Sequence, residues 1–436
     1  MHLKAQNSFS FFLCLVALLS VGSTFANPAA RDTLKVSGRE AEALFLKNNY
    51  ELILKQYDIE RAKAEEITAG LFDNPELSYE NLVYNPDTKK FFQTSSADGQ
   101  GQFNVQYSQL IRLAGKRNKA IRLAGVGLKL SEFEFADLLR TLRFSLRSNL
   151  CSLYFLQQSA SIYDQEIRSL QKTLEVFNVQ LSKGNIAEKE VLRVKSLIIA
   201  IQSEYASLQN NIDDLQAELK MLTGLPSNAV LWVESPGAVI TADAQLQLSY
   251  QQLLESALKN RPDLKAAKAG NEYAALNLKL QKANAVPDMT IFGTYDRQGS
   301  HVKHYTGLGL SVPIPLFSRN QGLITEAKAN LGASENLVKS KIASIEIELS
   351  NTYHATLRLR DLYENIRADA DTDFNRLISE LNSNYEKRNL GMLEFLDLYN
   401  SYRESFLRIN QLKADYLNSL EQLNYVTGSS TLDTSH

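Results

Sequence analysis

Two histidines stand at a spacing that could serve metal chemistry. His301 and His304 lie three positions apart, and neutral imidazole is a common ligand of zinc and related cations. No Cys and no cluster of carboxylates stands beside them, so exposed polarity is the favoured interpretation and a metal site the weak alternative. No nucleophile, base and orienting group occur at a recognisable catalytic spacing, and no phosphate-binding loop or cofactor motif is found. The sequence therefore predicts neither an enzyme nor a cofactor.

The N-terminal segment 1–26 has the layout of a secretory signal peptide. A short cationic start with Lys4 precedes an apolar run over 9–21, and small residues end the segment at Ala26. We expect cleavage after Ala26; a membrane anchor is less favoured, because the run is shorter than the roughly 20 residues of a spanning helix. Cleavage leaves Cys151 as the only cysteine, so no internal disulfide can form and we expect a buried, inert thiol.

Composition excludes several classes of protein. The chain has 436 residues, with 47 Lys and Arg against 49 Asp and Glu, which leaves no basic excess for binding a nucleic acid. Hydrophobic residues make up 44%, which argues against wholesale disorder. After the signal peptide no apolar run is long enough for a membrane-spanning helix. The nine Pro leave two Pro-free tracts, 87–225 and 316–436, which permit very long helices.

The chain is internally duplicated. Short segments of its first half recur in its second half, either 212 or 204 positions later. The matching pairs are 45–48 with 257–260, 74–76 with 286–288, 222–224 with 426–428, and Lys183 with Lys387. We infer two copies of one unit of about 200 residues.

Each copy has the same order of elements: a helix of about 30 residues, two strand-like segments around a polar loop, and a long helical hairpin. The first repeat is 27–224, with a helix over 38–70, strands over 76–84 and 102–110, and a hairpin over 116–222 with its tip near 184. A linker or equatorial segment follows over 225–248. The second repeat is 249–428, with a helix over 249–284, strands over 288–296 and 305–313, and a hairpin over 319–426 with its tip near 389; residues 429–436 form a tail.

The hairpin tracts carry apolar residues at alternating steps of three and four, a pattern typical of coiled coils. In the first tract the pattern includes Leu142, Leu146, Leu153 and Leu170. A helix of about 65 residues is about 100 Å long at 1.5 Å per residue, too long for a compact enzyme core. We therefore expect rods of paired helices that end at the turns.

The strand-like segments imply an oligomer. Each is about nine residues long, near the length that crosses a bilayer at a tilt. Four strands are too few to close a membrane barrel, and an open sheet in lipid would leave its edge amides unsatisfied. Strands in a membrane would therefore have to be shared between chains: about eight strands from two chains, or about 12 from three, which leaves room for a passage. Aromatic residues gather near these strands, as expected at a membrane interface: Tyr79, Tyr84, Phe91, Phe92, Tyr295 and Tyr305.

The order of elements resembles that of the TolC family of outer-membrane efflux channels. The resemblance covers nearly the whole mature chain and includes the Thr-Gly ends of the hairpins at 223–224 and 427–428. It also includes the segments QLIRLAGKR at 109–117 and VPIPLFSRNQG at 312–322. The second segment looks most like the CzcC-like branch, which exports heavy-metal cations.

The resemblance implies a homotrimer in the outer membrane of a Gram-negative bacterium. It implies a mainly α chain with a small β part, in which three chains form a 12-stranded β-barrel continued by a periplasmic α-helical barrel. The channel would be the passive exit duct of a tripartite efflux system, docked to a periplasmic adaptor and to an inner-membrane pump of the resistance-nodulation-division type. The pump selects the substrate, so metal cations and drugs both stay open. The alternative is a secreted or periplasmic coiled-coil scaffold or adaptor without a membrane barrel.

The resemblance also implies a gate at the periplasmic end of the tunnel. The acidic pair of the family falls on Glu394 and Asp397, its single gate aspartate on Glu190, and its gate tyrosine on Tyr385. The gate arginine falls on Leu390, so the usual ion pair is lost, and Arg388 is a possible substitute. Three copies of the acidic pair around a narrow axis would attract cations and repel anions; the alternative is that they are solvated charges on a helix exterior.

The hairpin turns would contact the adaptor, and we expect them to move outward when the channel opens. The turn residues are Gly184, Asn185, Asn389, Leu390 and Gly391.

Overall fold

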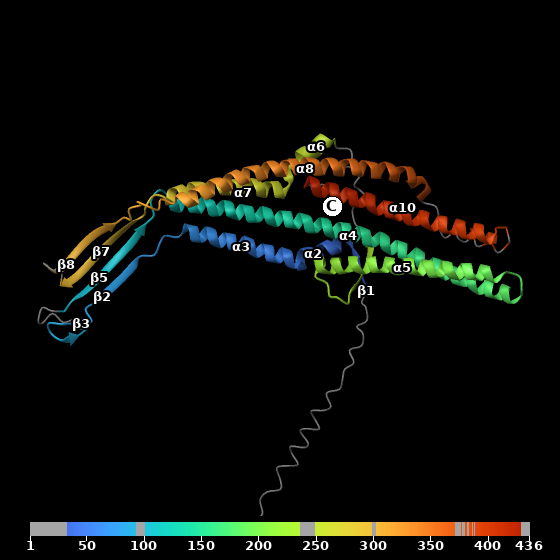
Figure 1. The fold of residues 1–436 in the computed structure, drawn as a ribbon, viewed down its shortest axis with the longest axis horizontal. Helices are drawn as coiled ribbons and strands as arrows, with labels where there is room; N and C mark the ends of the chain where they lie inside the picture. The colour runs from blue at the N-terminus through green and yellow to red at the C-terminus, as the bar shows by residue number, and fades with distance from the viewer. Residues whose placement is uncertain are drawn as a thin grey trace, which may run out of the picture.

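The protein is a long helical rod with a small sheet at one end and two hairpin turns at the other (Figure 1). The computed structural model describes residues 33–92, 101–235, 249–298, 302–370 and 389–428, together with 376, 380, 381, 383–385 and 387. The expected signal peptide and the C-terminal tail lie outside the described residues, as do His301 and Arg388. The mainly α fold class with a small β part is confirmed.

The two repeats have the same order of elements. The first contains α2 (Gly38–Asn48), α3 (Tyr50–Gly70), β2 (Glu76–Asn81), β5 (Phe103–Ile111), α4 (Lys116–Ser182) and α5 (Glu188–Thr223). The second contains α6 (Tyr250–Asn260), α7 (Pro262–Asn284), β7 (Met289–Gln298), β8 (Lys303–Ser311), α8 (Gln321–Ala370) and α10 (Met392–Thr427). Within the described part of the chain, no helix is both long and apolar enough to cross a membrane.

The first helix of each repeat is broken in two, where the sequence predicted one continuous helix. In the first repeat, Asn49 ends α2 and caps α3 by accepting a 3.0 Å hydrogen bond from the Leu52 N–H. In the second repeat, Pro262 opens α7, because proline suits a first helical position and disrupts a helix interior. Asparagine and proline at the break are thus local reasons for two short helices in place of one long helix.

The middle of the rod carries a two-stranded parallel sheet that the sequence did not reveal. It pairs β1 (Thr33–Ser37) with β6 (Val230–Ser235), so part of the expected linker is a strand. Side chains of the long helices bond the main chain of β6: the Gln157 side chain donates to the Leu231 carbonyl at 2.8 Å and accepts from the Val233 N–H at 3.1 Å.

The sheet at the end of the rod is four-stranded and antiparallel, in the order β2-β5-β7-β8. A small hairpin, β3 (Tyr84–Asn85) with β4 (Lys90–Phe91), stands beside it. The register places Leu77, Tyr107, Gly293 and Leu308 in one row across the sheet. Because successive side chains of a strand point to opposite faces, this register fixes the composition of both faces.

Helix α4 lies at the centre of the rod and contacts α3, α5, α7 and α10. The predicted apolar stripe of α4 is buried at Leu146, Leu153 and Leu170. A second face of α4 is also buried, because α10 packs against it; the Ser159 hydroxyl of this face accepts a 3.5 Å hydrogen bond from Asn410 of α10. A helix that packs against neighbours on several sides buries residues on more than one face, and the single apolar stripe predicted from the sequence accounts for only one of these faces.

Cys151 is fully buried, as the sequence predicted. Burial raises the pKa of its thiol to about 12, with a smaller contribution from the negative charge of Glu421. Since the thiolate is the reactive form, this cysteine is inert in the folded protein.

Candidate functional site

The two hairpin turns are built in the same way. In the first turn the Asn185 N–H donates a 2.9 Å hydrogen bond to the Gln180 carbonyl, and in the second the Asn389 N–H donates one of 2.9 Å to the Asn384 carbonyl. These bonds use the last free carbonyls of the incoming helices. Gly184 has a φ of +72°, a left-handed conformation that glycine adopts at low cost. The chain therefore reverses tightly at both tips.

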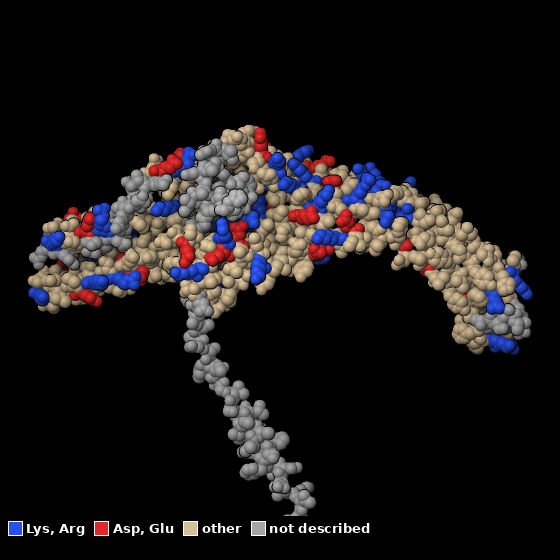
Figure 2. Space-filling view, turned by 180° about the vertical axis from the view of Figure 1, so that it is seen from behind, with Lys and Arg blue, Asp and Glu red and all other residues tan. Residues whose placement is uncertain are grey.

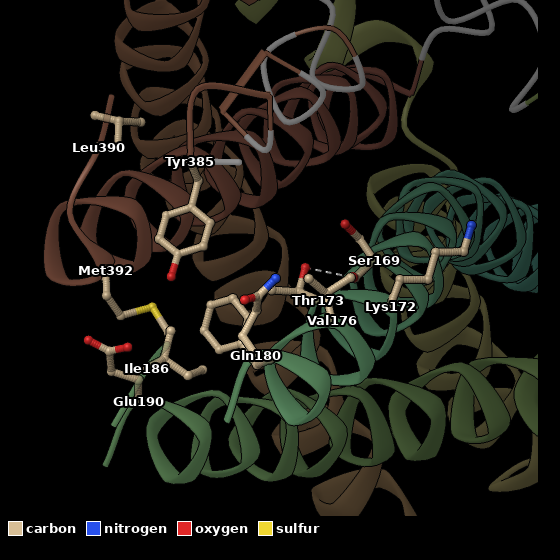
Figure 3. A pocket seen from close by; sticks show the side chains of 11 residues that line it. Ser169, Lys172, Thr173, Val176, Gln180, Ile186, Glu190, Tyr385, Leu390 and Met392 are labelled. Carbon is tan, nitrogen blue, oxygen red and sulfur yellow. Dashed lines mark hydrogen bonds between the residues drawn. The ribbon is translucent and has the colours of Figure 1, made fainter. Parts of the chain in front are cut away.

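A groove of about 540 Å³ lies between the two hairpins close to their turns (Figure 3). Helix α4 supplies one wall, and the residues around the two turns supply the other. The lining residues are Ser169, Lys172, Thr173, Val176, Phe177, Gln180, Ile186, Glu190, Tyr385, Leu390 and Met392.

Aromatic rings hold the two hairpins together along this groove. The ring centroid of Tyr385 lies 5.4 Å from that of Phe177 on α4 and 4.8 Å from that of Phe395 on α10. Phe395 in turn lies 5.6 Å from Tyr399. The rings of these pairs are tilted by 31° to 43°, and aromatic pairs contribute about 0.5–1.5 kcal/mol each beyond their buried area. The hairpins thus meet through an apolar, ring-to-ring contact.

The groove brings together two of the expected gate residues, Glu190 and Tyr385, with the turn residue Leu390. Tyr385 points from the second hairpin toward Met392 and the first hairpin (Figure 3). Burial raises the pKa of the Tyr385 hydroxyl, and the negative charge of Glu190 raises it further. Tyr385 is therefore a neutral hydrogen-bonding group, and Glu190 supplies the negative charge of the groove.

Glu394 and Asp397 lie near the start of α10, and both are exposed in the single chain. Neither lines the groove. Glu190 stands at the start of α5 in the matching place, so both repeats carry acidic residues just after the turn. A carboxylate is favoured there by the partial positive charge of the helix N-terminus.

Further along the rod, the helices enclose a charged cluster that sequence reasoning missed. The Glu166 carboxylate of α4 is 0% exposed, and its Oε1 lies 3.7 Å from Arg403 Nη1 of α10. Arg403 Nη1 lies 3.6 Å from Glu204 Oε2 of α5. Glu166 falls between the apolar positions of the predicted stripe, where a charged residue is normally solvated, so the sequence carries no signal of its burial.

The two faces of the four-stranded sheet differ in chemistry. The first, which we call the apolar face, is mostly apolar; it carries Leu77, Tyr79, Val105, Tyr107, Ile291, Tyr295, Leu308 and Leu310, with Asn81, Gln109 and Thr306 among them. The opposite, polar face is mostly polar; it carries Glu76, Ser78, Glu80, Asn104, Gln106, Ser108, Thr294 and Asp296, with Leu110 and Phe292 among them. Leu308 is 84% exposed and Leu310 68%, so large apolar side chains of the first face are uncovered in the single chain.

Charge is distributed accordingly over the surface. On the side drawn in Figure 2, Lys, Arg, Asp and Glu are frequent over the helical rod and sparse over the sheet. A contiguous apolar patch that is not covered by other parts of the chain marks a contact with a partner protein or with lipid.

Aromatic rings line up near the far end of the apolar face. The centroid of Phe103 lies 6.1 Å from Tyr79 and 5.9 Å from Tyr295, and Tyr295 lies 6.3 Å from His304. Tyr305, one of the aromatics expected at an interface, belongs instead to the opposite face, because its register partner is Asp296.

His304 does not gather with other potential metal ligands. Its Nδ1 lies 2.8 Å from the Tyr295 hydroxyl, and no group of three or more His, Cys, Asp or Glu among the described residues could hold a metal ion.

Comparison with known sequences agrees with this geometry. Residues 253–429 match the family model described as outer membrane efflux protein. The cobalt-zinc-cadmium resistance protein CzcC of Cupriavidus metallidurans is 23% identical over 281 residues, which are 64% of this chain and 63% of CzcC. The pyoverdine export outer membrane protein OpmQ of Pseudomonas putida is 22% identical over 256 residues, which are 56% of this chain and 53% of OpmQ. The matches thus span less than two thirds of the length of either relative.

Solved structures share the fold over most of the chain. The outer membrane channel CmeC of Campylobacter jejuni superposes with a TM-score of 0.71 at 15% identity, covering 90% of this chain and 85% of CmeC. The outer membrane protein VceC of Vibrio cholerae superposes with a TM-score of 0.67 at 16% identity, covering 90% of this chain and 96% of VceC. The likeness therefore covers nine tenths of this chain, and it shows a shared fold.

Proposed function

We propose, from the match of residues 253–429 to the family model described as outer membrane efflux protein, that this chain is one subunit of an outer-membrane exit duct. The duct conducts substrates passively from a periplasmic adaptor and an inner-membrane pump to the outside of a Gram-negative cell. OpmQ is described as an export outer membrane protein and CmeC as an outer membrane channel, and this chain is likewise proposed to conduct substrates without catalysis.

The observation that carries this proposal is the two-faced sheet. Its apolar face exposes Leu308, Leu310 and Leu77, which suits contact with lipid, while its polar face suits a water-filled interior. Burial of such side chains in hydrocarbon contributes about 25 cal/mol per Å² of apolar area.

The edges of the sheet support closure by several chains. In the single chain β2 and β8 each have one unpaired edge, and in lipid an unsatisfied backbone group costs several kcal/mol. The four strands alternate in direction, so β8 of one chain and β2 of the next would pair antiparallel around a closed ring. Three chains would give about 12 strands and an open lumen, and the helical rods would continue that lumen through the periplasm.

The hairpin tips are the proposed gate and adaptor site. Glu394 and Asp397 would face the axis, where three copies make a cation-attracting ring. Glu190 and Tyr385 would form the hairpin contact behind that ring. Leu390 stands where the family carries its gate arginine, so the closed state would be held mainly by the aromatic contact of Tyr385 in place of an ion pair. Arg388 stays a candidate substitute.

The substrate class is proposed to be heavy-metal cations, after the description of CzcC. Siderophores are the second candidate, after the description of OpmQ. A deletion strain would separate the two candidates. We expect the strain to lose tolerance to zinc, cobalt or cadmium, whereas a loss of siderophore export with unchanged metal tolerance would favour the second candidate.

The central test is to purify the mature protein and ask where and how it assembles. We expect it in the outer-membrane fraction as a heat-modifiable trimer that forms pores in planar bilayers. A water-soluble monomer that needs no detergent would overturn the proposal.

The adaptor contact needs a separate experiment. A photo-crosslinking residue at Asn185 or Asn389 should capture a periplasmic adaptor in cells, while the same residue at Asn210, an exposed asparagine on α5 far from the turn, should not. Equal capture at all three positions, or at none, would contradict a tip-docked adaptor.

A further inference from the structure

The cluster of the buried Glu166 and Arg403 with the partly exposed Glu204 joins the first hairpin to α10, well away from the turns. Glu166 belongs to α4, Glu204 to α5 and Arg403 to α10, so the cluster bridges both helices of the first hairpin and the last helix of the second. No role follows for it from a passive duct with a gate at its tip.

The cluster is charged but poorly bonded. Neither oxygen of the Glu166 carboxylate has a hydrogen-bond partner, and Arg403 Nε and Nη1 also have none. The separation of 3.7 Å between Arg403 and Glu166 is too long for a hydrogen bond, although the charges still attract. A buried ionised carboxylate without hydrogen bonds is costly, and protonation or hydration removes that cost.

Two tyrosines complete the surroundings of Glu166. Tyr163 of α4 donates a 3.2 Å hydrogen bond to Glu204 Oε2, and burial raises the pKa of Tyr163 to about 12. Burial also raises the pKa of Tyr399 on α10. Both hydroxyls stay neutral at ordinary pH, so Arg403 and Glu204 are the charges that face Glu166.

We propose that Glu166 is a proton-operated catch between the hairpins: protonated Glu166 keeps α10 packed against α4, and ionised Glu166 favours their separation. Separation lets water hydrate the carboxylate and Arg403 together. The consequence at the gate rests on the proposed function, because α10 also carries Phe395, Glu394 and Asp397; the separation itself does not.

The burial of Glu166 determines whether the packed arrangement gains or loses stability as the pH rises. Burial raises the pKa of Glu166 to about 7, although the charge of Arg403 lowers it, so the packed arrangement holds the proton more tightly than an arrangement in which water reaches the carboxylate. The packed arrangement is therefore favoured at low pH and loses stability as the pH rises from the ordinary value of 4.5 toward about 7. One proton per chain changes the packing equilibrium by about tenfold per pH unit within this window.

The test compares amide hydrogen exchange in α10 of the purified full-length protein, in whatever oligomeric state it has, at pH 5.5 and pH 8, after correction for intrinsic rates. In the unmodified protein we expect exchange between Phe395 and Arg408 to be at least about tenfold faster at the higher pH. Glu166→Gln, a neutral isostere, should be protected at both values. Glu204→Gln is the comparison variant, because it leaves Glu166 titratable and removes a neighbouring carboxylate that is 47% exposed. It should keep a pH dependence that lies at somewhat lower pH, because the charge of Glu204 raises the pKa of Glu166.

A second variant keeps the test decisive if Glu166→Gln does not assemble. Arg403→Met removes the cation that lowers the pKa of Glu166, so the transition should move to higher pH. The catch is overturned if α10 exchange in the unmodified protein does not change with pH, or if Glu166→Gln keeps the full change. Pore formation in bilayers is measured separately. If the protein forms pores but hydrogen exchange in α10 does not depend on pH, only the proposed catch is refuted. If exchange in α10 depends on pH but the protein forms no pores, only the proposed function as an exit duct is refuted.

Discussion

The side-chain amide of Asn49 donates a 3.0 Å hydrogen bond to the main-chain carbonyl of Leu222, at the end of the first hairpin. In the second repeat Arg261 occupies the place of Asn49, and its Nη1 donates to the Val426 carbonyl at 3.2 Å. Each contact satisfies a carbonyl in the last turn of a long helix, which has no intrahelical partner. The break in the first helix of each repeat thus anchors the end of the hairpin of the same repeat.

Glycine makes this contact possible. Gly224 follows the first hairpin with a φ of +66°, and a Cβ there would lie 2.7 Å from the Asn48 Cβ. Gly428 follows the second hairpin with a φ of +62°, and a Cβ there would lie 3.0 Å from the Arg261 main chain. The Thr-Gly ends noted in the sequence are therefore packing sites as well as helix ends.

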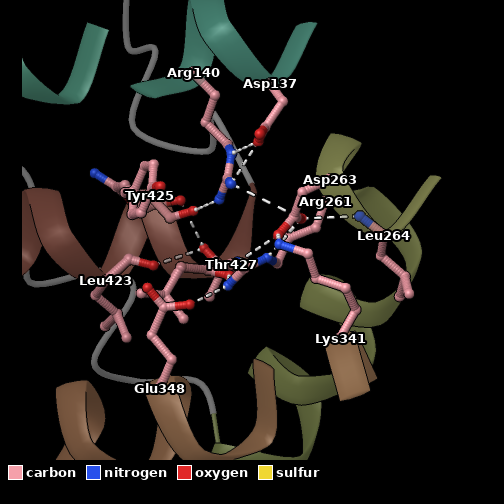
Figure 4. Close-up of polar contacts among 12 residues, drawn as sticks. Asp137, Arg140, Arg261, Asp263, Leu264, Lys341, Glu348, Leu423, Tyr425 and Thr427 are labelled. Carbon is pink, nitrogen blue, oxygen red and sulfur yellow. Dashed lines mark hydrogen bonds and ion pairs between the residues drawn. The ribbon is translucent and has the colours of Figure 1, made fainter. Parts of the chain in front are cut away.

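Removing the Arg261 guanidinium should destabilise the middle of the rod. Arg261 holds Asp263 at 2.8 Å and Glu348 at 2.6 Å in a buried network (Figure 4). Arg261→Met leaves the Asp263 carboxylate buried beside weaker partners, and breaking a buried pair in this way costs about 3–5 kcal/mol. Denaturant unfolding followed by the fluorescence of Trp232, the only tryptophan, measures the loss.

Two further variants are expected to lose less stability than Arg261→Met and serve as comparisons. Asn49→Ala removes the matching neutral hydrogen bond and should cost about 1–3 kcal/mol. The Lys341 ammonium lies 3.4 Å from Asp263, and the Lys341 side chain is 40% exposed. Lys341→Met should therefore lower the free energy of unfolding by less than about 1 kcal/mol. A smaller loss for Arg261→Met than for Lys341→Met would contradict the anchoring role.

Cys151 should resist alkylation in the folded protein. Burial raises the pKa of its thiol to about 12, so at pH 8 almost none is thiolate, and the side chain is inaccessible. Iodoacetamide labelling followed by mass spectrometry should give little modification natively and complete modification in denaturant. Rapid native labelling would mean that α4 opens near its middle.

The sequence predicted the duplication and the long hairpins because both depend on local pattern. Matched offsets, Pro-free tracts and steps of three and four identify α4, α5 and α10 from spacing alone. The alternation of Phe103, Val105 and Tyr107 predicted β5 in the same way, since period two defines the face of a strand.

Long-range partners explain what the sequence did not reveal. The strands β1 and β6 are short and lie almost 200 positions apart in the sequence. Part of the β6 main chain is hydrogen-bonded by the side chain of Gln157, which looks like an ordinary polar residue in the sequence. The buried Glu166 and Arg403 are likewise visible only when α4 and α10 are placed together. The gate assignment is a further case: the groove unites Glu190 with Tyr385, whereas Glu394 lies outside it.

A charge on the apolar face of the sheet should block membrane assembly. Leu308→Arg places a cation where lipid is proposed, which costs about 2–4 kcal/mol near the bilayer midplane. Gln106→Arg puts the same side chain on the polar face, facing the proposed water-filled interior, and should assemble normally. The yield of heat-modifiable oligomer in the membrane fraction measures both. A lower yield for Gln106→Arg than for Leu308→Arg would mean that the faces have been assigned the wrong way round, and equal yields would mean that the sheet is not in lipid.

Removing the acidic pair after the second turn should change conduction and leave assembly intact. Both side chains are exposed and neither lines the groove between the hairpins, so Glu394→Ala with Asp397→Ala should leave the oligomer as stable as the parent. If three copies ring the axis, six carboxylates concentrate cations at the narrowest point, and their loss should raise single-channel conductance or weaken block by polyvalent cations. Glu404→Ala, an exposed carboxylate further along α10, is the matched control and should alter neither property. Bilayer recordings that are identical for the double variant and the parent would place Glu394 and Asp397 on the solvated exterior and move the gate to the Glu190–Tyr385 groove.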